Sequence, residues 1–303
     1  MTPTLTAPAP AGAAPSPARA LPLLTVPASA IPTSPAADVR RPVLFTGAPE
    51  ACWLGRYRFP MLVSRNRLVR LKRKFPLAIT PWILDSGGFT HLRMNGRWIV
   101  SAEQYADEVL KWQETIGGLV AAAPQDWMCE PDVLRLTGKT IREHQELTVA
   151  NFLRLRELAP TIPWMPVLQG WTLGSYSTHL EMYAKAGVDL HLERRVGVGS
   201  ICRRQNSVTI AVLLDILAQA GLRNLHGFGV KIRGLELSGD RLFSVDSAAW
   251  SYHASRENIR LPECDHAAAD CRACPRYAEH WHTDLIERAL VTWPEEHHPA
   301  HLN

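Results

Sequence analysis

Residues 82–89 read Trp-Ile-Leu-Asp-Ser-Gly-Gly-Phe, an apolar run that ends in a carboxylate followed by small residues. A second stretch, residues 242–247, reads Leu-Phe-Ser-Val-Asp-Ser and has the same form. Short apolar runs of this kind predict buried β-strands, and an acid at the end of such a run lies on the rim of a sheet or barrel. The two acids, Asp85 and Asp246, could divide the roles of nucleophile and acid/base, as displacement at a sugar anomeric carbon through a covalent intermediate requires.

Counting these two, eight apolar segments of strand length follow one another along the chain. They lie at residues 42–46, 60–64, 80–85, 122–128, 163–169, 195–199, 224–230 and 242–246. Helical patterns separate several of them, and repeated alternation of strand and helix favours an α/β fold of the (β/α)8, or TIM barrel, type. A doubly wound open sheet is the alternative.

Three of the predicted helices have recognisable ends. The helix over 101–117 stops at a pair of glycines, and Thr140 begins a capping box ahead of 141–158. Asn206 can cap a further helix that ends at Gly221. These boundaries support the alternation of strands and helices.

Polar residues and glycines gather at or just past the ends of the predicted strands, where a barrel has its active site. They are Asp85, Asp126, Gln169, Gly197, Gly199, His226, Gly227, Gly229 and Asp246. Each also has a structural interpretation, because an Asp before Ser-Gly-Gly can form a turn and glycines can serve close packing. Their joint placement on one rim favours a functional site.

The length and composition of the chain limit its possible domain organisation. The 303 residues are 46% hydrophobic and 20% charged, which is enough apolar material for a large folded domain. Residues 1–38 are dominated by Ala, Pro, Thr and Ser and predict a disordered tail, because they contain too few large apolar groups to offset the entropy of ordering. We expect a barrel over 39–260 and a zinc-binding subdomain with a C-terminal helix over 261–303.

The sequence also predicts the cellular compartment. It has neither an apolar run long enough to span a membrane nor the charged start and apolar core of a signal peptide. We therefore expect a cytoplasmic protein without a membrane partner. Of its six cysteines, three are scattered and three are clustered, which suits reduced thiols and a metal better than disulfides.

Basic residues are concentrated although the net charge is only +4. Six of them fall within one ten-residue segment: Arg65, Arg67, Arg70, Lys72, Arg73 and Lys74. Arg203 and Arg204 follow the glycine-rich segment 196–200. A solvated helix face explains such a cluster without any ligand. The local positive field could instead neutralise several phosphates of a nucleic acid.

The C-terminal region contains four potential metal ligands with the spacing C-x-H-x4-C-x2-C: Cys264, His266, Cys271 and Cys274. Four soft or borderline ligands in so short a segment can surround Zn²⁺ tetrahedrally and leave no open position. The pattern therefore predicts a structural zinc site. His280 or His282 could replace His266 as the fourth ligand.

Several motifs, taken in order, resemble the tRNA-guanine transglycosylase superfamily. They are Asp-Ser-Gly-Gly-Phe at 85–89, Val-Leu-Gln-Gly at 167–170, Val-Gly-Val-Gly-Ser at 196–200, His-Gly-Phe-Gly-Val at 226–230, the late Asp246 and the Cys/His cluster. Residues 125–131, 196–204 and 244–250 more closely resemble its DNA-modifying, DpdA-like branch. That branch exchanges guanine in DNA for a 7-deazaguanine such as 7-cyano-7-deazaguanine (preQ0).

The resemblance implies a role for each matching position in a pentosyltransferase. Asp246 would be the nucleophile that attacks C1′ and expels guanine, and Asp85 would be the acid/base, so that two inversions retain the β-configuration. The base would bind to Ser86, Asp126, Gln169, Gly170, Gly197 and Gly199. The guanine would have to be flipped or single-stranded. The basic residues at 65–74 and 203–204 would hold phosphates.

Departures from the tRNA enzymes favour the DNA branch. Thr90 replaces a usual Gln, Trp171 follows Gln169-Gly170 in place of a glycine, and the zinc spacing is altered. A tRNA-guanine transglycosylase and a non-catalytic, zinc-containing nucleic-acid-binding subunit are the alternatives, although two carboxylates facing a polyanion argue against the second. The implied partners are DNA and a 7-deazaguanine base, and a requirement for a helper ATPase is left open.

Overall fold

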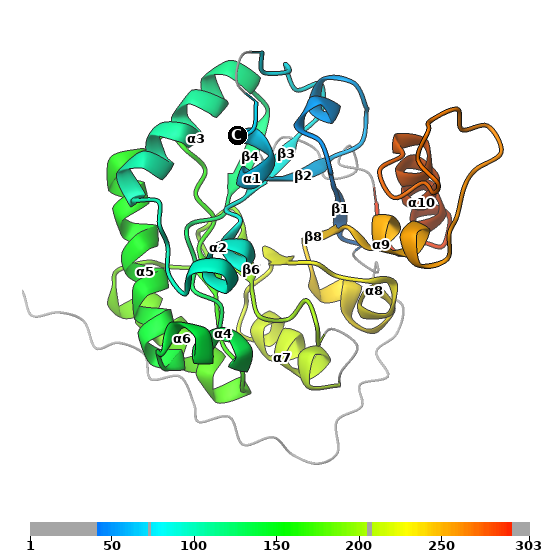
Figure 1. The fold of residues 1–303 in the computed structure, drawn as a ribbon. Helices are drawn as coiled ribbons and strands as arrows, with labels where there is room; N and C mark the ends of the chain where they lie inside the picture. Colours follow the sequence, from blue (N-terminus) through cyan, green and yellow to red (C-terminus); the bar gives the residue numbers. More distant parts are fainter. Residues whose placement is uncertain (1–40, 72–73, 205–207, 293–303) are drawn as a thin grey trace, which may run out of the picture. The chain divides into compact units, whose positions relative to one another are not determined.

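A computed structural model describes residues 41–71, 74–204 and 208–292. The predicted tail at 1–38 and the predicted cap at Asn206 lie outside these ranges. Figure 1 shows the described part as an α/β fold in which helices surround the outer face of one parallel sheet.

Eight short strands form this sheet in the described residues. They are β1 (Val43–Gly47), β2 (Met61–Ser64), β3 (Trp82–Asp85), β4 (Leu119–Ala122), β5 (Val167–Leu168), β6 (Val196–Val198), β7 (Leu225–Gly227) and β8 (Ser244–Ser247). All neighbours pair in parallel, in the order β4-β3-β2-β1-β8-β7-β6-β5. This order follows the sequence around the sheet, without the reversal that marks a doubly wound fold.

The two edges of the sheet, β4 and β5, approach one another without forming a ladder. One isolated parallel bridge joins Ala122 to Trp164. Ala122 N donates to Pro163 O at 3.0 Å, and Met165 N donates to Ala122 O at 2.9 Å. The α/β prediction is therefore confirmed as a curled, eight-stranded parallel half-barrel. The described residues do not contain the continuous ladder of a complete barrel.

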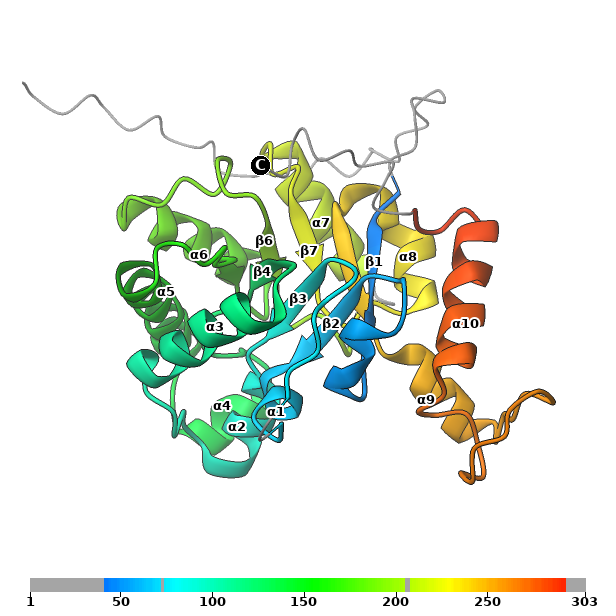
Figure 2. The ribbon, with the colours of Figure 1, turned by 90° about the horizontal axis from the view of Figure 1, so that it is seen from above.

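Side chains alternate between the two faces of the sheet, as the pleat of a strand requires. Trp82 and Leu84 of β3 belong to the main core, whereas Ile83 belongs to a separate apolar cluster that includes Phe45 of β1. Asp85, two residues after Ile83, therefore shares the face of the smaller cluster. In Figure 2, α3 and α5 lie at the left of the curled sheet and α8 and α10 at the right.

The described helices follow the strands in sequence, with 3-10 turns at Ala51–Gly55 and Gly239–Arg241. They are α1 (Arg65–Leu68), α2 (Gly88–Asn95), α3 (Ala102–Ile116), α4 (Pro131–Thr137), α5 (Ile141–Leu158), α6 (Leu173–Lys185), α7 (Val208–Gln219), α8 (Ile232–Ser238), α9 (Ala249–Arg256) and α10 (Pro275–Glu287). Two of the predicted boundaries are confirmed at the level of hydrogen bonds. Thr140 and Glu143 form a reciprocal capping box before α5, and α3 stops at Gly117, where φ is +69°.

The predicted strand at 122–128 is wrong for most of its length. β4 ends at Ala122, because Pro124 has no N–H for a ladder and the chain leaves the sheet there. The segment that follows is a loop, and it carries Asp126 beyond the carboxyl end of β4. The predicted strand at 163–169 is likewise reduced to the two residues of β5.

Candidate active site

The first carboxylate lies at the carboxyl end of β3. Asp85 is the last residue of the strand, and the Ser64 hydroxyl at the end of β2 donates to it. Gly87 then turns the chain into α2 with φ +79°, where a Cβ would lie 2.6 Å from the Asn66 side chain. Loss of hydration raises the pKa of Asp85, and the charge of Asp246 raises it further. The carboxyl therefore keeps its proton to higher pH than a free aspartic acid does.

The second carboxylate lies on β8 and is almost wholly buried. Asp246 Oδ1 accepts a hydrogen bond from Gly229 N at 3.0 Å and lies 3.4 Å from His226 Nε2. His226 is fully buried on β7, and its Nδ1 lies 2.9 Å from Ser244 Oγ. Burial lowers the pKa of His226, which favours a neutral ring. The β7–α8 loop and His226 together hold the carboxylate in place.

Asp126 and Gln169 come together at the same end of the sheet. Gln169 Nε2 donates to Asp126 Oδ2 at 2.5 Å, and Ser86 Oγ donates to Oδ1 at 3.3 Å. Burial and then the charge of Asp85 raise the pKa of Asp126 to about 7. Because Asp85 also feels the charge of Asp246, the three aspartates form one electrostatically coupled group.

The three glycines expected to bind the base have different surroundings. A Cβ at Gly199 would lie 2.6 Å from the amide carbon of Gln169, so this glycine lets the amide approach the backbone. A Cβ at Gly197 would lie 2.6 Å from a ring carbon of Phe228, and one at Gly170 would collide with α6. Gly199 therefore borders the site, whereas Gly197 and Gly170 make room for side chains of this chain.

Two buried side chains behind Gln169 were not expected from the sequence. Ser200 Oγ lies 2.7 Å from Gln169 Oε1 and 2.9 Å from Glu130 Oε2. Seventy positions separate Glu130 from Ser200, and polar side chains at that separation give no sequence signal of a contact. Only the folded arrangement of the loops after β4, β5 and β6 brings them together.

The basic residues between 65 and 74 do not share one environment. Arg65 is buried, and its guanidinium makes a twofold ion pair with Glu108, at 2.6 and 2.8 Å. It therefore does not present its charge to solvent, contrary to the prediction of a phosphate contact. Among the others, Arg67 is half-buried, Arg70 and Lys74 are exposed, and Lys72 and Arg73 lie outside the described residues.

Arg203 and Arg204 follow β6, and each lies over an aromatic ring. Arg204 is 4.0 Å from the ring centre of Trp171 and donates to its carbonyl oxygen at 2.8 Å. Arg203 is exposed, lies 4.9 Å from the ring centre of Phe89 and pairs with Asp132 at 3.2 Å. Both cations therefore lie beside the loops that follow β3, β5 and β6, which also carry site residues.

The predicted Cys/His cluster has the dimensions of a metal site. The ligand atoms of its four residues all lie within 4.8 Å of one another. Cys271 Sγ is 3.8 Å from Cys264 Sγ and 3.5 Å from His266 Nε2. A tetrahedral zinc site with ordinary bond lengths needs S···S and S···N separations of about 3.8 and 3.5 Å. The four residues could therefore hold a metal ion.

The alternative fourth ligands lie outside this cluster. His282 is buried against β1, with its Nδ1 3.2 Å from Thr46 Oγ1. His280 is exposed on α10 and lies 3.9 Å from Glu263. The arrangement therefore favours His266 as the fourth ligand.

Hydrogen bonds also fix the backbone around the Cys/His cluster. Arg260 donates to the carbonyl oxygens of Cys264 at 3.1 Å and of His266 at 2.8 Å. Leu261 N donates to Cys271 Sγ at 3.3 Å. Hydrogen bonds of this kind orient ligands around a metal.

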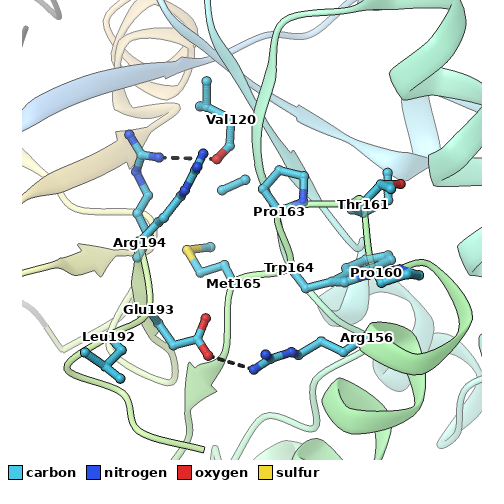
Figure 3. A pocket seen from close by; sticks show the side chains of 13 residues that line it. Val120, Arg156, Pro160, Thr161, Pro163, Trp164, Met165, Leu192, Glu193 and Arg194 are labelled. Carbon is cyan, nitrogen blue, oxygen red and sulfur yellow. Dashed lines mark hydrogen bonds and ion pairs between the residues drawn. The ribbon is translucent and has the colours of Figure 1, made fainter. Parts of the chain in front are cut away.

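A cavity of about 450 Å³ opens at the opposite end of the strands (Figure 3). It is lined by residues at or before the starts of β4, β5 and β6, among them Val120 and Met165. The ion pair between Arg156 and Glu193, at 2.8 Å, lies along its edge. Because the coupled aspartates lie at the carboxyl ends, this cavity is not part of the candidate site.

Comparison with known proteins identifies a family for this chain. The model of the family described as DpdA, DeoxyPurine in DNA protein A, matches residues 41–300. The chain has no match among curated proteins. The matched region includes every strand, the coupled aspartates and the Cys/His cluster, and it agrees with the DpdA-like resemblance of the motifs. Within the described residues, no helix combines the length and the apolar character needed to cross a membrane.

Proposed function

The chain belongs to the DpdA family, and we propose that it is a DNA-guanine transglycosylase that exchanges guanine in DNA for a 7-deazaguanine such as 7-cyano-7-deazaguanine. The observation that carries this proposal is the coupled group of Asp85, Asp126 and Asp246 at one end of the sheet. Base exchange through a covalent intermediate needs a group to bond the sugar and a group to carry a proton. A third carboxylate can bind N–H groups of the base.

In the first step, Asp246 attacks C1′ of the target nucleotide. The bond from C1′ to N9 breaks, its electron pair passes to guanine, and Asp85 donates a proton to the leaving base. In the second step, the incoming base gives its N9 proton to the Asp85 carboxylate, and N9 attacks C1′. The ester bond to Asp246 then breaks. Two inversions retain the configuration at C1′.

The contacts of the two catalytic carboxyls support these roles. Asp246 Oδ1 already accepts a hydrogen bond from Gly229 N, so we assign the attack on C1′ to Oδ2. The raised pKa of Asp85 suits a group that must hold a proton before it donates one.

Asp126 and Gln169 have the chemistry to bind the guanine edge. A carboxylate can accept the N1–H and N2–H groups, and an amide can both donate and accept. The site lies at the end of a sheet and not on a flat surface, so a guanine in a duplex must be flipped out, which costs a few kcal/mol. We keep Ser86 and Gly199 as base-site residues because Ser86 bonds Asp126 and Gly199 borders Gln169.

A DNA substrate needs cations along its path. We propose that phosphates contact the exposed or half-buried cations near the rim, together with Lys72 and Arg73, which lie outside the described residues. These are Arg67, Arg70, Lys72, Arg73, Lys74, Arg203 and Arg204. Each contact would release counterions and make binding salt-dependent. A DNA substrate also agrees with the cytoplasmic location expected from the sequence.

We assign the Cys/His cluster to a structural Zn²⁺ ion, because four protein ligands would leave no position for a reactant. Such an ion supplies folding free energy to the segment that holds it. We further propose that residues 261–303 form a subdomain on a barrel over 39–260, closed between β4 and β5 through the bridge at Ala122. A helper ATPase has no support from the family match or from the described residues.

The test is production of the protein in cells that make 7-cyano-7-deazaguanine. DNA from these cells is digested to nucleosides and analysed by mass spectrometry. A deazaguanine deoxynucleoside should appear with the wild-type protein and be absent with Asp246→Ala. Its absence from DNA together with incorporation into tRNA would contradict the DNA assignment.

A further inference from the structure

Four side chains form a continuous hydrogen-bonded row behind the proposed base site. Glu130 Oε2 lies 2.9 Å from Ser200 Oγ, which lies 2.7 Å from Gln169 Oε1. Gln169 Nε2 donates to Asp126 Oδ2 at 2.5 Å. Cys129 N also donates to Ser200 Oγ, at 2.8 Å. Glu130, Ser200 and Gln169 are all buried, so these contacts replace contacts with water.

The row needs one protonated carboxyl. A serine hydroxyl has one proton to donate, yet Ser200 Oγ faces oxygen atoms of both Glu130 and Gln169. In one arrangement Glu130 is protonated and donates to Ser200, which donates to Gln169 Oε1, and Gln169 Nε2 donates to an ionised Asp126. In the other the Gln169 amide is turned over, Ser200 donates to an ionised Glu130, and Asp126 holds the proton.

The surroundings favour the first arrangement. Glu130 is only 4% exposed and has one neighbouring hydroxyl, Ser200 Oγ, at 2.9 Å. Asp126 is partly exposed and has two side-chain partners, Gln169 and Ser86. A negative charge is more stable where hydration and donors are greater. Burial raises the pKa of both carboxyls, that of Asp126 to about 7, so Asp126 carries the charge from about neutral pH upward, while Glu130, with less hydration and fewer donors, keeps the proton.

The backbone conformation of Ser200 also supports a role for its hydroxyl. Its φ is +55°, in the left-handed region that is unfavourable for residues other than glycine. Gly197 and Gly199 lie in the same segment, and a glycine at 200 would relax the backbone. A serine held in this conformation indicates that its hydroxyl is needed.

We propose that Glu130 and Ser200 are positioning residues that fix the orientation of the Gln169 amide, so that an ionised Asp126 faces the base. This inference rests on the proposed function and names the groups that set its base specificity. An ionised Asp126 accepts the N–H groups of a guanine-type edge. A turned-over amide beside a neutral Asp126 presents the wrong donors and acceptors, so loss of the row weakens binding of the base.

The thiols, the phenols and His179 near the row each stay in one protonation state around neutral pH. Burial raises the pKa of the nearby thiols and phenols and lowers that of His179 to about 4, so all of these are uncharged. Asp85 also has a raised pKa. The groups facing Glu130 are Asp132, Arg203, Cys129, Cys202 and Tyr176, and those near Asp126 and Gln169 are Asp85, Tyr105, Cys129, Tyr183 and His179.

The first test is base exchange by two variants of the full chain. Ser200→Gly removes the hydroxyl while relaxing the backbone, and KM for the incoming base should rise about tenfold or more with a smaller change in kcat. Glu130→Gln retains a donor toward Ser200, so KM should stay near the wild-type value at neutral pH. In the wild type KM should rise at alkaline pH as Glu130 ionises, and in Glu130→Gln this rise should be absent.

The matched control is Ala289→Gly, which relieves the same backbone strain at φ +56° far along the chain, after α10. Its KM should equal that of the wild type. An unchanged KM in Ser200→Gly, or the same alkaline rise in Glu130→Gln as in the wild type, would overturn the positioning role.

The second test does not depend on catalysis. In protein labelled with ¹⁵N-glutamine, the side-chain amide signal of Gln169, assigned by its loss in Gln169→Leu, should shift in Ser200→Gly. At alkaline pH, where Asp126 is already ionised, it should also shift in the wild type as Glu130 ionises but not in Glu130→Gln. A wild-type protein that exchanges no base refutes the proposed function. A Gln169 signal that does not shift in Ser200→Gly, and that keeps its pH dependence in Glu130→Gln, refutes the hydrogen-bonded row.

Discussion

Replacing Gly199 by alanine should remove base recognition while leaving the fold intact. The new Cβ would lie 2.6 Å from the amide carbon of Gln169, where carbon atoms normally keep about 3.5–4.0 Å, so the amide must move by roughly 1 Å. That movement breaks its hydrogen bonds to Asp126 and Ser200. The backbone at 199 is not in the left-handed region, so the effect comes from the side chain alone.

The size of the effect follows from the bond to Asp126. A hydrogen bond to a charged group contributes about 1.5–3 kcal/mol, which corresponds to roughly a 10- to 150-fold rise in KM for the incoming base. Steady-state exchange of a labelled base measures this rise. The control is Gly174→Ala on α6, where a Cβ meets nothing within 4 Å. It should leave KM unchanged and raise stability by about 0.5–1 kcal/mol. Equal KM values in both variants would show that the Gln169 amide does not bind the base.

Four further predictions concern charge and stability. Asp126→Asn should gain stability relative to the wild type as pH rises from about 4 to 7, by about 1.4 kcal/mol per pH unit, because the wild-type fold binds a proton that the unfolded chain releases. Urea unfolding at several pH values measures this, and a constant difference would contradict it. Cys264→Ser should lose the bound metal and melt several degrees lower; an unchanged zinc content by atomic absorption would count against the site. His226→Phe should lower kcat about tenfold with little change in KM, since Asp246 loses a neighbour at 3.4 Å; an unchanged kcat would show that the contact is dispensable. Alanine at both Arg70 and Lys74 should reduce the slope of log K for DNA against log salt by up to about 2, and an equal slope would exclude both from the phosphate path.

The sequence predicted the strands that carry Asp85 and Asp246 because their apolar runs are short and end in distinctive residues. Residues 80–85 and 242–246 differ from β3 and β8 by only a few positions at their ends. The Cys/His cluster was also predictable, because metal ligands close in sequence have little freedom to separate.

Other features depend on contacts between distant segments. The segment at 122–128 has the apolar character of a strand, but Pro124 and the turn after it move Asp126 into a loop. In the sequence, Arg65 is one of a cluster of basic residues and cannot be told apart from its exposed neighbours. In the structure, Glu108 of α3 binds it inside the protein. The contact between Glu130 and Ser200 likewise arises only when separate loops meet at one end of the sheet.

We propose a covalent bond between Asp246 and the sugar of DNA. It is tested most directly by incubating the protein with a labelled guanine-containing oligonucleotide, quenching under denaturing conditions, and mapping the adduct by peptide mass spectrometry. We expect an adduct on Asp246 in the wild type and none in Asp246→Asn. Base exchange by Asp246→Asn, or an adduct mapped to another residue, would contradict it.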